Sequence, residues 1–225
     1  HNSKYGELQR SSFQINNTML TTDCNILKEI ASTSIEYCSR LKTDDEAFLK
    51  YLEITGSARY NINNVLIDLY RWNDEFRYME WFKNKKKAKI NELKDQRLKL
   101  GKLFQYGDNL VICGNPVAML MAVTGQSVTQ ENCFRQYDDR IQCCTSRFEE
   151  GEMLAGFRSP HNSPNNIVYL ENVHPESIKK YFPNLDNNVI IINGIGTDVQ
   201  SRLNGQDLDT DSIYTTNQKN IVELA

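Results

Sequence analysis

Residues 205–211 have the sequence Gly-Gln-Asp-Leu-Asp-Thr-Asp, and this stretch is the most informative part of the chain for its fold. Its three carboxylates, Asp207, Asp209 and Asp211, stand at positions i, i+2 and i+4, and like charges this close repel one another. A hard divalent cation removes that cost because it takes oxygen ligands from all three. On a strand or tight loop, side-chain alternation points the carboxylates the same way and turns Leu208 toward a core. The stretch therefore predicts a metal-binding loop, with no basic side chain beside it.

The acidic stretch has two other possible interpretations. A calcium EF-hand also opens with Asp-x-Asp-x-Asp, but its sixth position would be Ser212 where glycine is needed. Its twelfth position would be Gln218 where a bidentate glutamate is needed, so this alternative fails. A plain acidic turn stays open when the stretch is taken alone.

The sequence around the acidic stretch is typical of short strands broken by turns. Apolar and β-branched runs predict strands at 110–113, 141–145, 153–157, 167–171, 189–193 and 212–216. Short helical turns are expected at 116–123, 175–182 and 198–203, the first of them with Asn115 as its cap and proline at its first position. Irregularly spaced strands with helical inserts favour a small barrel over a doubly wound sheet.

The first half of the chain has a different character. Apolar periodicity predicts helices at 25–41, 44–54, 60–72 and 74–100, with Thr43 and Glu46 forming a capping box for the second. All five prolines lie beyond residue 115 and nine of the eleven glycines lie beyond residue 100. We therefore predict an α+β protein, with a helical domain at 1–105 followed by a β-barrel domain at 106–225 that carries the acidic loop.

Charge divides in the same way. Residues 1–106 hold 18 Lys and Arg against 14 Asp and Glu, whereas residues 107–225 hold 8 against 15. The basic run at 83–89, Lys-Asn-Lys-Lys-Lys-Ala-Lys, is either a grip for phosphate groups or a solvated helix face.

Cysteine usage and apolar runs bear on the compartment. The six cysteines form no Cys-x-x-Cys pair, and the longest apolar runs span only a few residues, too short for a membrane helix. The first thirty residues contain no apolar run ahead of a small-residue cleavage site. We expect reduced thiols, no membrane partner and a cytoplasmic location.

The order of motifs resembles that of a known family. An Arg-x-Pro loop at 158–160 is followed by a strand, a spacer, an apolar strand, the acidic stretch and a last strand. This order resembles the catalytic double-psi β-barrel of cell-encoded RNA-dependent RNA polymerases of the RNA-silencing type and their bacterial and phage single-chain relatives. Residues that match the family's Arg-Asn-Pro, Pro-Gly-Asp and Asp-x-Asp-Gly-Asp motifs are Arg158, Pro160, Pro164, Asp207, Asp209 and Asp211.

The chain also departs from the family pattern in places. Ser159 stands for the family's asparagine, Asn165 and Asn166 stand for its Gly-Asp, and Thr210 replaces the glycine between the last two aspartates. A threonine there demands either a different backbone conformation or a strained one. The resemblance covers about residues 145–217.

The resemblance implies a function. Asp207, Asp209 and Asp211 would be the catalytic residues that hold Mg²⁺ or Mn²⁺ for nucleotidyl transfer from nucleoside triphosphates to an RNA 3′ end, and Arg158 would face the incoming nucleotide. Partners would be nucleoside triphosphates, a nucleic acid template and the RNA product. A second barrel bearing lysines would lie outside this chain, so we expect an excised segment that is incomplete as a catalyst.

Two alternatives of other classes stay open at this stage. One is a non-catalytic relative, a metal-stabilised scaffold or protein-binding module. The other is a metal-dependent phosphodiesterase, since carboxylate sites with two metal ions also serve hydrolysis.

Overall fold

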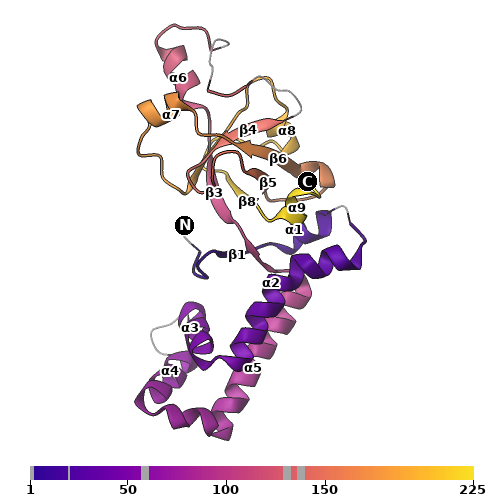
Figure 1. Ribbon diagram of the computed structural model, residues 1–225, viewed down its shortest axis with the longest axis vertical. Helices are drawn as coiled ribbons and strands as arrows, with labels where there is room; N and C mark the ends of the chain where they lie inside the picture. The colour runs from indigo at the N-terminus through magenta and orange to yellow at the C-terminus, as the bar shows by residue number, and fades with distance from the viewer. Residues whose placement is uncertain (1–2, 20, 57–60, 129–132, 136–139) are drawn as a thin grey trace. The chain divides into compact units, whose positions relative to one another are not determined.

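The computed structural model describes residues 3–19, 21–56, 61–128, 133–135 and 140–225 (Figure 1). The chain forms two compact units. One comprises His1–Gln9, Gln14–Ile26 and Tyr106–Ala225, and the other comprises Arg10–Phe13 and Leu27–Gln105. The predicted α+β fold is confirmed, because a helical region precedes a closed β-barrel. The domain division at residues 105 and 106 stays a prediction.

The helical unit is built mainly from helices in the first half of the chain. Its elements are α2 (Cys24–Thr43), α3 (Asp45–Thr55), α4 (Ile62–Trp72), η1 (Asp74–Tyr78), α5 (Glu80–Gln96) and η2 (Leu98–Leu100). Phe48 of α3 and Phe82 of α5 are fully buried, and their rings meet edge to face with centroids 6.0 Å apart. Aromatic pairs in this arrangement add to the stability that burial gives.

Two helix boundaries in this unit differ from the prediction. The capping box of Thr43 and Glu46 is wrong: α2 runs through Thr43, whose hydroxyl donates back to the carbonyl of Ser39. Asp44 caps α3 instead, accepting from the amide of Ala47 at 3.0 Å. Aspartate caps a helix at least as well as threonine, so the one-residue shift costs nothing.

The helix expected at 74–100 is broken into η1, α5 and η2. Met79 adopts an extended conformation between η1 and α5. The break lets the ring of Phe76 pack against that of Phe82, with the ring centroids 5.4 Å apart. The first residue of the helix expected at 60–72, Tyr60, lies outside the described residues, and Asn61 caps α4.

Two short strands and a short helix lie near the N-terminus and the middle of the chain. These are β1 (Leu8–Arg10), α1 (Phe13–Thr18) and β2 (Phe104–Tyr106), and β1 and β2 form a two-stranded sheet.

All six strands predicted in the second half form one closed barrel. They are β3 (Asp108–Cys113), β4 (Ile141–Cys144), β5 (Met153–Phe157), β6 (Ile167–Asn172), β7 (Val189–Ile192) and β8 (Ser212–Thr216). Their order around the barrel is β3-β7-β4-β6-β5-β8. The pairs β3–β7 and β4–β6 are parallel and the other four pairs are antiparallel, so the barrel is mixed.

Apolar side chains from every strand fill the barrel. The buried cluster comprises Leu110, Ile112, Ile141, Cys143, Leu154, Val168, Leu170, Ile190, Ile192, Val199, Leu203 and Ile213. Short helical elements connect the strands: α6 (Pro116–Val123), η4 (Pro164–Asn166), α7 (Glu176–Tyr181) and α8 (Val199–Arg202), with α9 (Lys219–Val222) after the last strand. Asn115 caps α6 and proline occupies its first turn, as predicted. Among the described residues, no helix combines the length and apolarity needed to cross a bilayer.

Gly107 shows how tightly the barrel closes. It precedes β3, with φ of 156°, and a Cβ atom on it would stand 2.4 Å from the carbonyl oxygen of Thr215 in β8. That carbonyl is backbone and cannot move aside without disturbing the pairing of β3 with β8.

We expect Gly107→Ala to lower the free energy of unfolding by about 1–3 kcal/mol, as overpacking does in other proteins. The matched control is Gly194→Ala, because a Cβ there would meet no heavy atom within 4 Å and φ is not positive. Urea denaturation of both variants measures the difference. Equal stability of the two would contradict the closure described here.

Candidate metal centre

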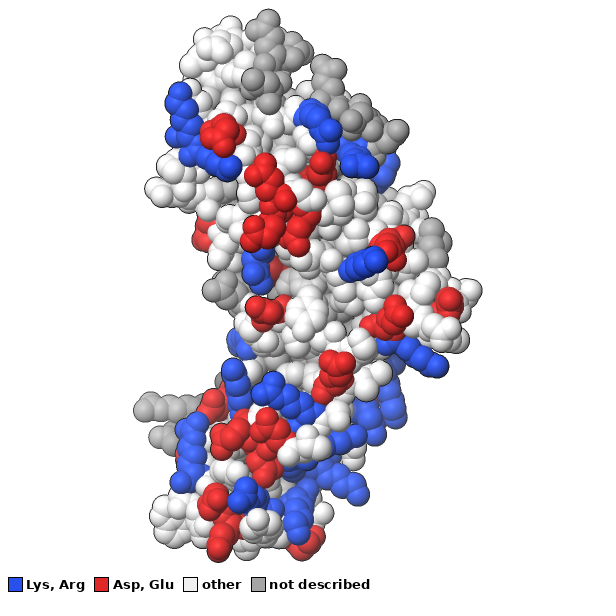
Figure 2. Space-filling model, in the orientation of Figure 1, with Lys and Arg blue, Asp and Glu red and all other residues white. Residues whose placement is uncertain are grey.

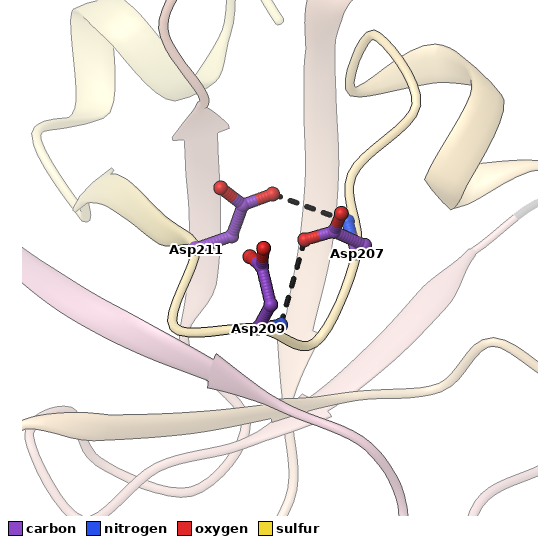
Figure 3. A group of neighbouring side chains, drawn as sticks. All are labelled: Asp207, Asp209 and Asp211. Carbon is purple, nitrogen blue, oxygen red and sulfur yellow. Dashed lines mark hydrogen bonds between the residues drawn. The ribbon is translucent and has the colours of Figure 1, made fainter.

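The acidic stretch forms a loop between α8 and β8, and its carboxylates converge (Figure 3). One ligand oxygen from each of Asp207, Asp209 and Asp211 lies within 4.8 Å of the other two. Asp207 and Asp209 are exposed and Asp211 is half-buried. The structure thus brings together the three aspartates that the sequence singled out, with at least two of them open to solvent.

Backbone amides shape this loop. The amide of Asp207 donates to Oδ2 of Asp211 at 3.1 Å, and the amide of Asp209 donates to Oδ1 of Asp207 at 3.4 Å (Figure 3). Each bond folds the chain so that a carboxylate faces the residue two or four positions away. Backbone hydrogen bonds within the loop therefore support the convergence of the carboxylates.

Thr210 and Leu208 lie between the aspartates, and neither has the conformation that a regular strand would give it. Thr210 has φ of 91°, in the left-handed region that a β-branched side chain rarely adopts, so the departure from the family's glycine is a strained position. The expectation that Leu208 faces a core is wrong, because its side chain is 55% exposed. The loop bends at 208–210 and does not continue the strand, so simple alternation does not hold there.

The expectation that no basic side chain stands beside the aspartates is also wrong. Arg158 Nη2 forms an ion pair with Asp211 Oδ2 at 2.6 Å, with side-chain exposures of 16% and 20%. Arg158 Nη1 also donates to the carbonyls of Leu203 and Asn204, at 2.9 and 3.0 Å. Arg158 therefore holds the acidic loop at Asp211 and at the turn that leads into the loop.

These contacts move two carboxyl pKa values in opposite directions. The hydrogen bond with Asp207, together with the negative charge of that neighbour, raises the pKa of Asp209 above its ordinary value. The hydrogen bond from Arg158 is the main cause that lowers the pKa of Asp211. Like charge thus destabilises the ionised form of Asp209, while Arg158 stabilises that of Asp211.

Two asparagines that were not predicted as site residues, Asn166 and Asn204, hold the Arg158 loop against this turn. Asn166, at the end of η4, is buried and donates to the carbonyl of Arg202 and to Oδ1 of Asn204, both at 2.9 Å. Asn204 in turn donates to the carbonyl of Pro160 at 2.6 Å. The available signals were that Asn166 stands where the family has aspartate and that Asn204 precedes a glycine in a loop.

His161 lies in the same loop, and its side chain is buried against the ring of Phe157, with centroids 5.3 Å apart. Burial lowers its pKa to about 4. The imidazole is therefore neutral at physiological pH, and neither ring nitrogen has a hydrogen-bond partner among the described residues.

Comparison with known proteins agrees with this architecture. No protein-family model matches the chain, and no curated protein matches it in sequence. Among solved structures, the RNA-dependent RNA polymerase QDE-1 from Thielavia terrestris is similar, with a TM-score of 0.64 and 14% sequence identity. The similarity covers 97% of this chain and 26% of that polymerase, so the chain spans about a quarter of its length. The closed, mixed six-stranded barrel and this similarity confirm the predicted resemblance: the fold is that of the double-psi barrel of RNA-dependent RNA polymerases.

The opposite environments of Asp209 and Asp211 predict opposite effects of neutralising them. Asp209→Asn removes a repelled charge, so in EDTA the free energy of unfolding should stay the same or rise slightly. Asp211→Asn removes the partner of Arg158 and should lower it by about 1.5–3 kcal/mol, the usual worth of a hydrogen bond to a charged group. Urea denaturation of the two variants provides the test, and equal losses in both would show that Asp209 also holds the loop together.

Proposed function

We propose that the chain is the catalytic-barrel segment of a single-chain RNA polymerase, which transfers nucleotides from nucleoside triphosphates to an RNA 3′ end with Mg²⁺ or Mn²⁺. The observation that carries the proposal is the convergence of three carboxylates within 4.8 Å on a barrel whose fold matches QDE-1.

The donor set fits a hard divalent cation. Asp207, Asp209 and Asp211 offer only oxygen ligands, which Mg²⁺ and Mn²⁺ prefer, and the exposure of the first two leaves room for water and phosphate oxygens. When bound, such an ion lowers the pKa of an attacking hydroxyl and neutralises charge on the leaving pyrophosphate. The chain's own part is to hold three carboxylates at fixed positions, which the amide hydrogen bonds of the loop support.

Arg158 is proposed to face the sugar or phosphate of the incoming nucleotide while it holds Asp211. Support comes from its ion pair with that ligand, since a guanidinium bonded to a metal ligand stands next to any nucleotide that the metal would bind.

The triphosphate needs further positive groups, and we propose that a second barrel outside this chain supplies them as lysines. Residues 107–225 hold 8 Lys and Arg against 15 Asp and Glu, and their adjacent basic pair, Lys179 and Lys180, lies on α7. The 225-residue chain would then be incomplete as a catalyst by itself. A cytoplasmic location belongs to the same proposal.

One observation favours a second candidate, a non-catalytic scaffold or protein-binding module. The ion pair of Arg158 with Asp211 compensates part of the acidic charge without any metal. A loop whose charge is partly compensated in this way could serve structure alone, and loss of Asp209 would then leave any RNA synthesis unchanged.

Primer extension by the full-length protein that carries this chain separates the two candidates. Asp209→Ala should lower the rate by several orders of magnitude, because it removes metal-assisted activation of the hydroxyl. Arg158→Ala should lower the rate of primer extension about ten- to a hundredfold, because it removes one charged contact.

The matched control is Asp186→Ala, which removes an exposed carboxylate outside the acidic loop and should leave the rate unchanged. RNA synthesis that persists in Asp209→Ala at the wild-type rate would contradict the proposed catalytic role and favour the scaffold.

A further inference from the structure

A basic cavity lies within the helical unit, away from the acidic loop in sequence. Its volume is about 430 Å³, within the range of pockets that hold small ligands. The end of α2, the start of α3, η1 and α5 all contribute to its lining. The charged residues that line it are Lys42, Asp45, Arg77, Lys83, Lys86 and Lys87.

Positive charge in this cavity exceeds the negative charge available to pair with it. Lys86 contacts Asp45 at 2.6 Å, and both side chains are largely buried. Arg77 and Lys83 pair with Asp74 and Glu80 outside the lining, but those pairs are solvent-exposed and such contacts are weak. Figure 2 shows Lys and Arg crowded on the helical part of the chain, with carboxylates between them.

Lys42 and Lys87 are the cations with the most to gain from an anionic ligand. Both are exposed, and neither forms an ion pair within the described part of the chain. Lys83, Lys86 and Lys87 stand at i, i+3 and i+4 on α5, so they project from one side of that helix.

Apolar side chains back the cavity, and an exposed aromatic ring lies beside it. Phe82 and Ile90 line it, and both are almost completely buried. Tyr78 lies beside the lining and not in it: it is 64% exposed, and the guanidinium carbon of the lining residue Arg77 lies 5.2 Å from the centre of its ring. Cations beside an exposed aromatic ring are the combination that single-stranded nucleic acids bind, phosphate on the cations and base on the ring.

We propose that this cavity binds the backbone of single-stranded RNA, with Lys42 and Lys87 each contacting a phosphate. A nucleotide carries its charge beside a sugar and a flat base, which fits a concave site with cations around apolar side chains. A carboxylate of an acidic protein brings charge without a ring. The choice of RNA among single-stranded nucleic acids rests on the proposed function, whereas the phosphate chemistry of the cavity does not.

Fluorescence anisotropy with a labelled oligouridine of about 12 nucleotides tests the proposal. The logarithm of the binding constant falls linearly with the logarithm of the salt concentration, and each lost phosphate contact makes this slope about 0.7 less steep. If the variants bind equally at 1 M salt, each lost contact weakens binding about fivefold at 0.1 M salt. The double variant Lys42→Gln/Lys87→Gln should therefore bind about 25-fold more weakly at that salt and reduce the slope by about 1.4.

The matched control is Lys50→Gln/Lys85→Gln, which removes the same charge from two exposed lysines that do not line the cavity. It should bind within about twofold of wild type, since it leaves the phosphate contacts intact. Equal weakening of both double variants would overturn the site, because net charge alone would explain the binding. Unchanged affinity in Lys42→Gln/Lys87→Gln would overturn it as well.

Two further arms identify the ligand. Displacement of the RNA by poly-glutamate or by inorganic tripolyphosphate at equal charge concentration would overturn the assignment to nucleic acid, whereas resistance to both supports it. Asp209→Ala should bind the oligonucleotide as wild type does. The binding test can therefore be made whether or not that variant still synthesises RNA. If the wild-type protein synthesises RNA but the cavity does not bind the oligonucleotide, the cavity inference is refuted and the proposed polymerase function is not.

Discussion

The antiparallel pairing of β5 with β8 is the constraint on which the candidate site depends. Phe157, the last residue of β5, pairs with Tyr214, the middle residue of β8. Antiparallel strands bring the end of one beside the beginning of the other. Arg158, which follows β5, therefore lies beside Asp211, which precedes β8, and their ion pair at 2.6 Å is a consequence of the barrel's register.

That ion pair divides the acidic loop into a fixed carboxylate, Asp211, and two exposed ones, Asp207 and Asp209. It fixes Asp211 by charge and hydrogen bonding, while Asp207 and Asp209 remain exposed and electrostatically unfavourable next to each other. A loop of this kind holds one carboxylate in place and leaves two carboxylates whose mutual repulsion a cation would relieve. The strained backbone at Thr210 is held by the same contacts, since the residues on both sides of it are hydrogen-bonded.

Much of the barrel could be predicted from the sequence, because each strand is a short apolar run between turn residues. The strands at 153–157 and 212–216 and the helix at 116–123 have the bounds expected from their sequences. Strand order could not be predicted, since it depends on contacts between residues far apart in the chain. The ion pair of Arg158 and the exposure of Leu208 follow from that order and from the bend of the loop, so local periodicity gave no signal for either.

The central claim is that Asp207, Asp209 and Asp211 bind one divalent cation together, and a Mn²⁺ titration followed by water-proton relaxation tests it most directly. The proposal predicts relaxation enhancement in the wild-type chain, with weak affinity because Mn²⁺ and Mg²⁺ recruit nucleotide phosphates for tight binding. Asp186→Ala should titrate as wild type does, and Asp209→Ala should lose most of the enhancement. Identical titration curves for wild type and Asp209→Ala would contradict the metal site.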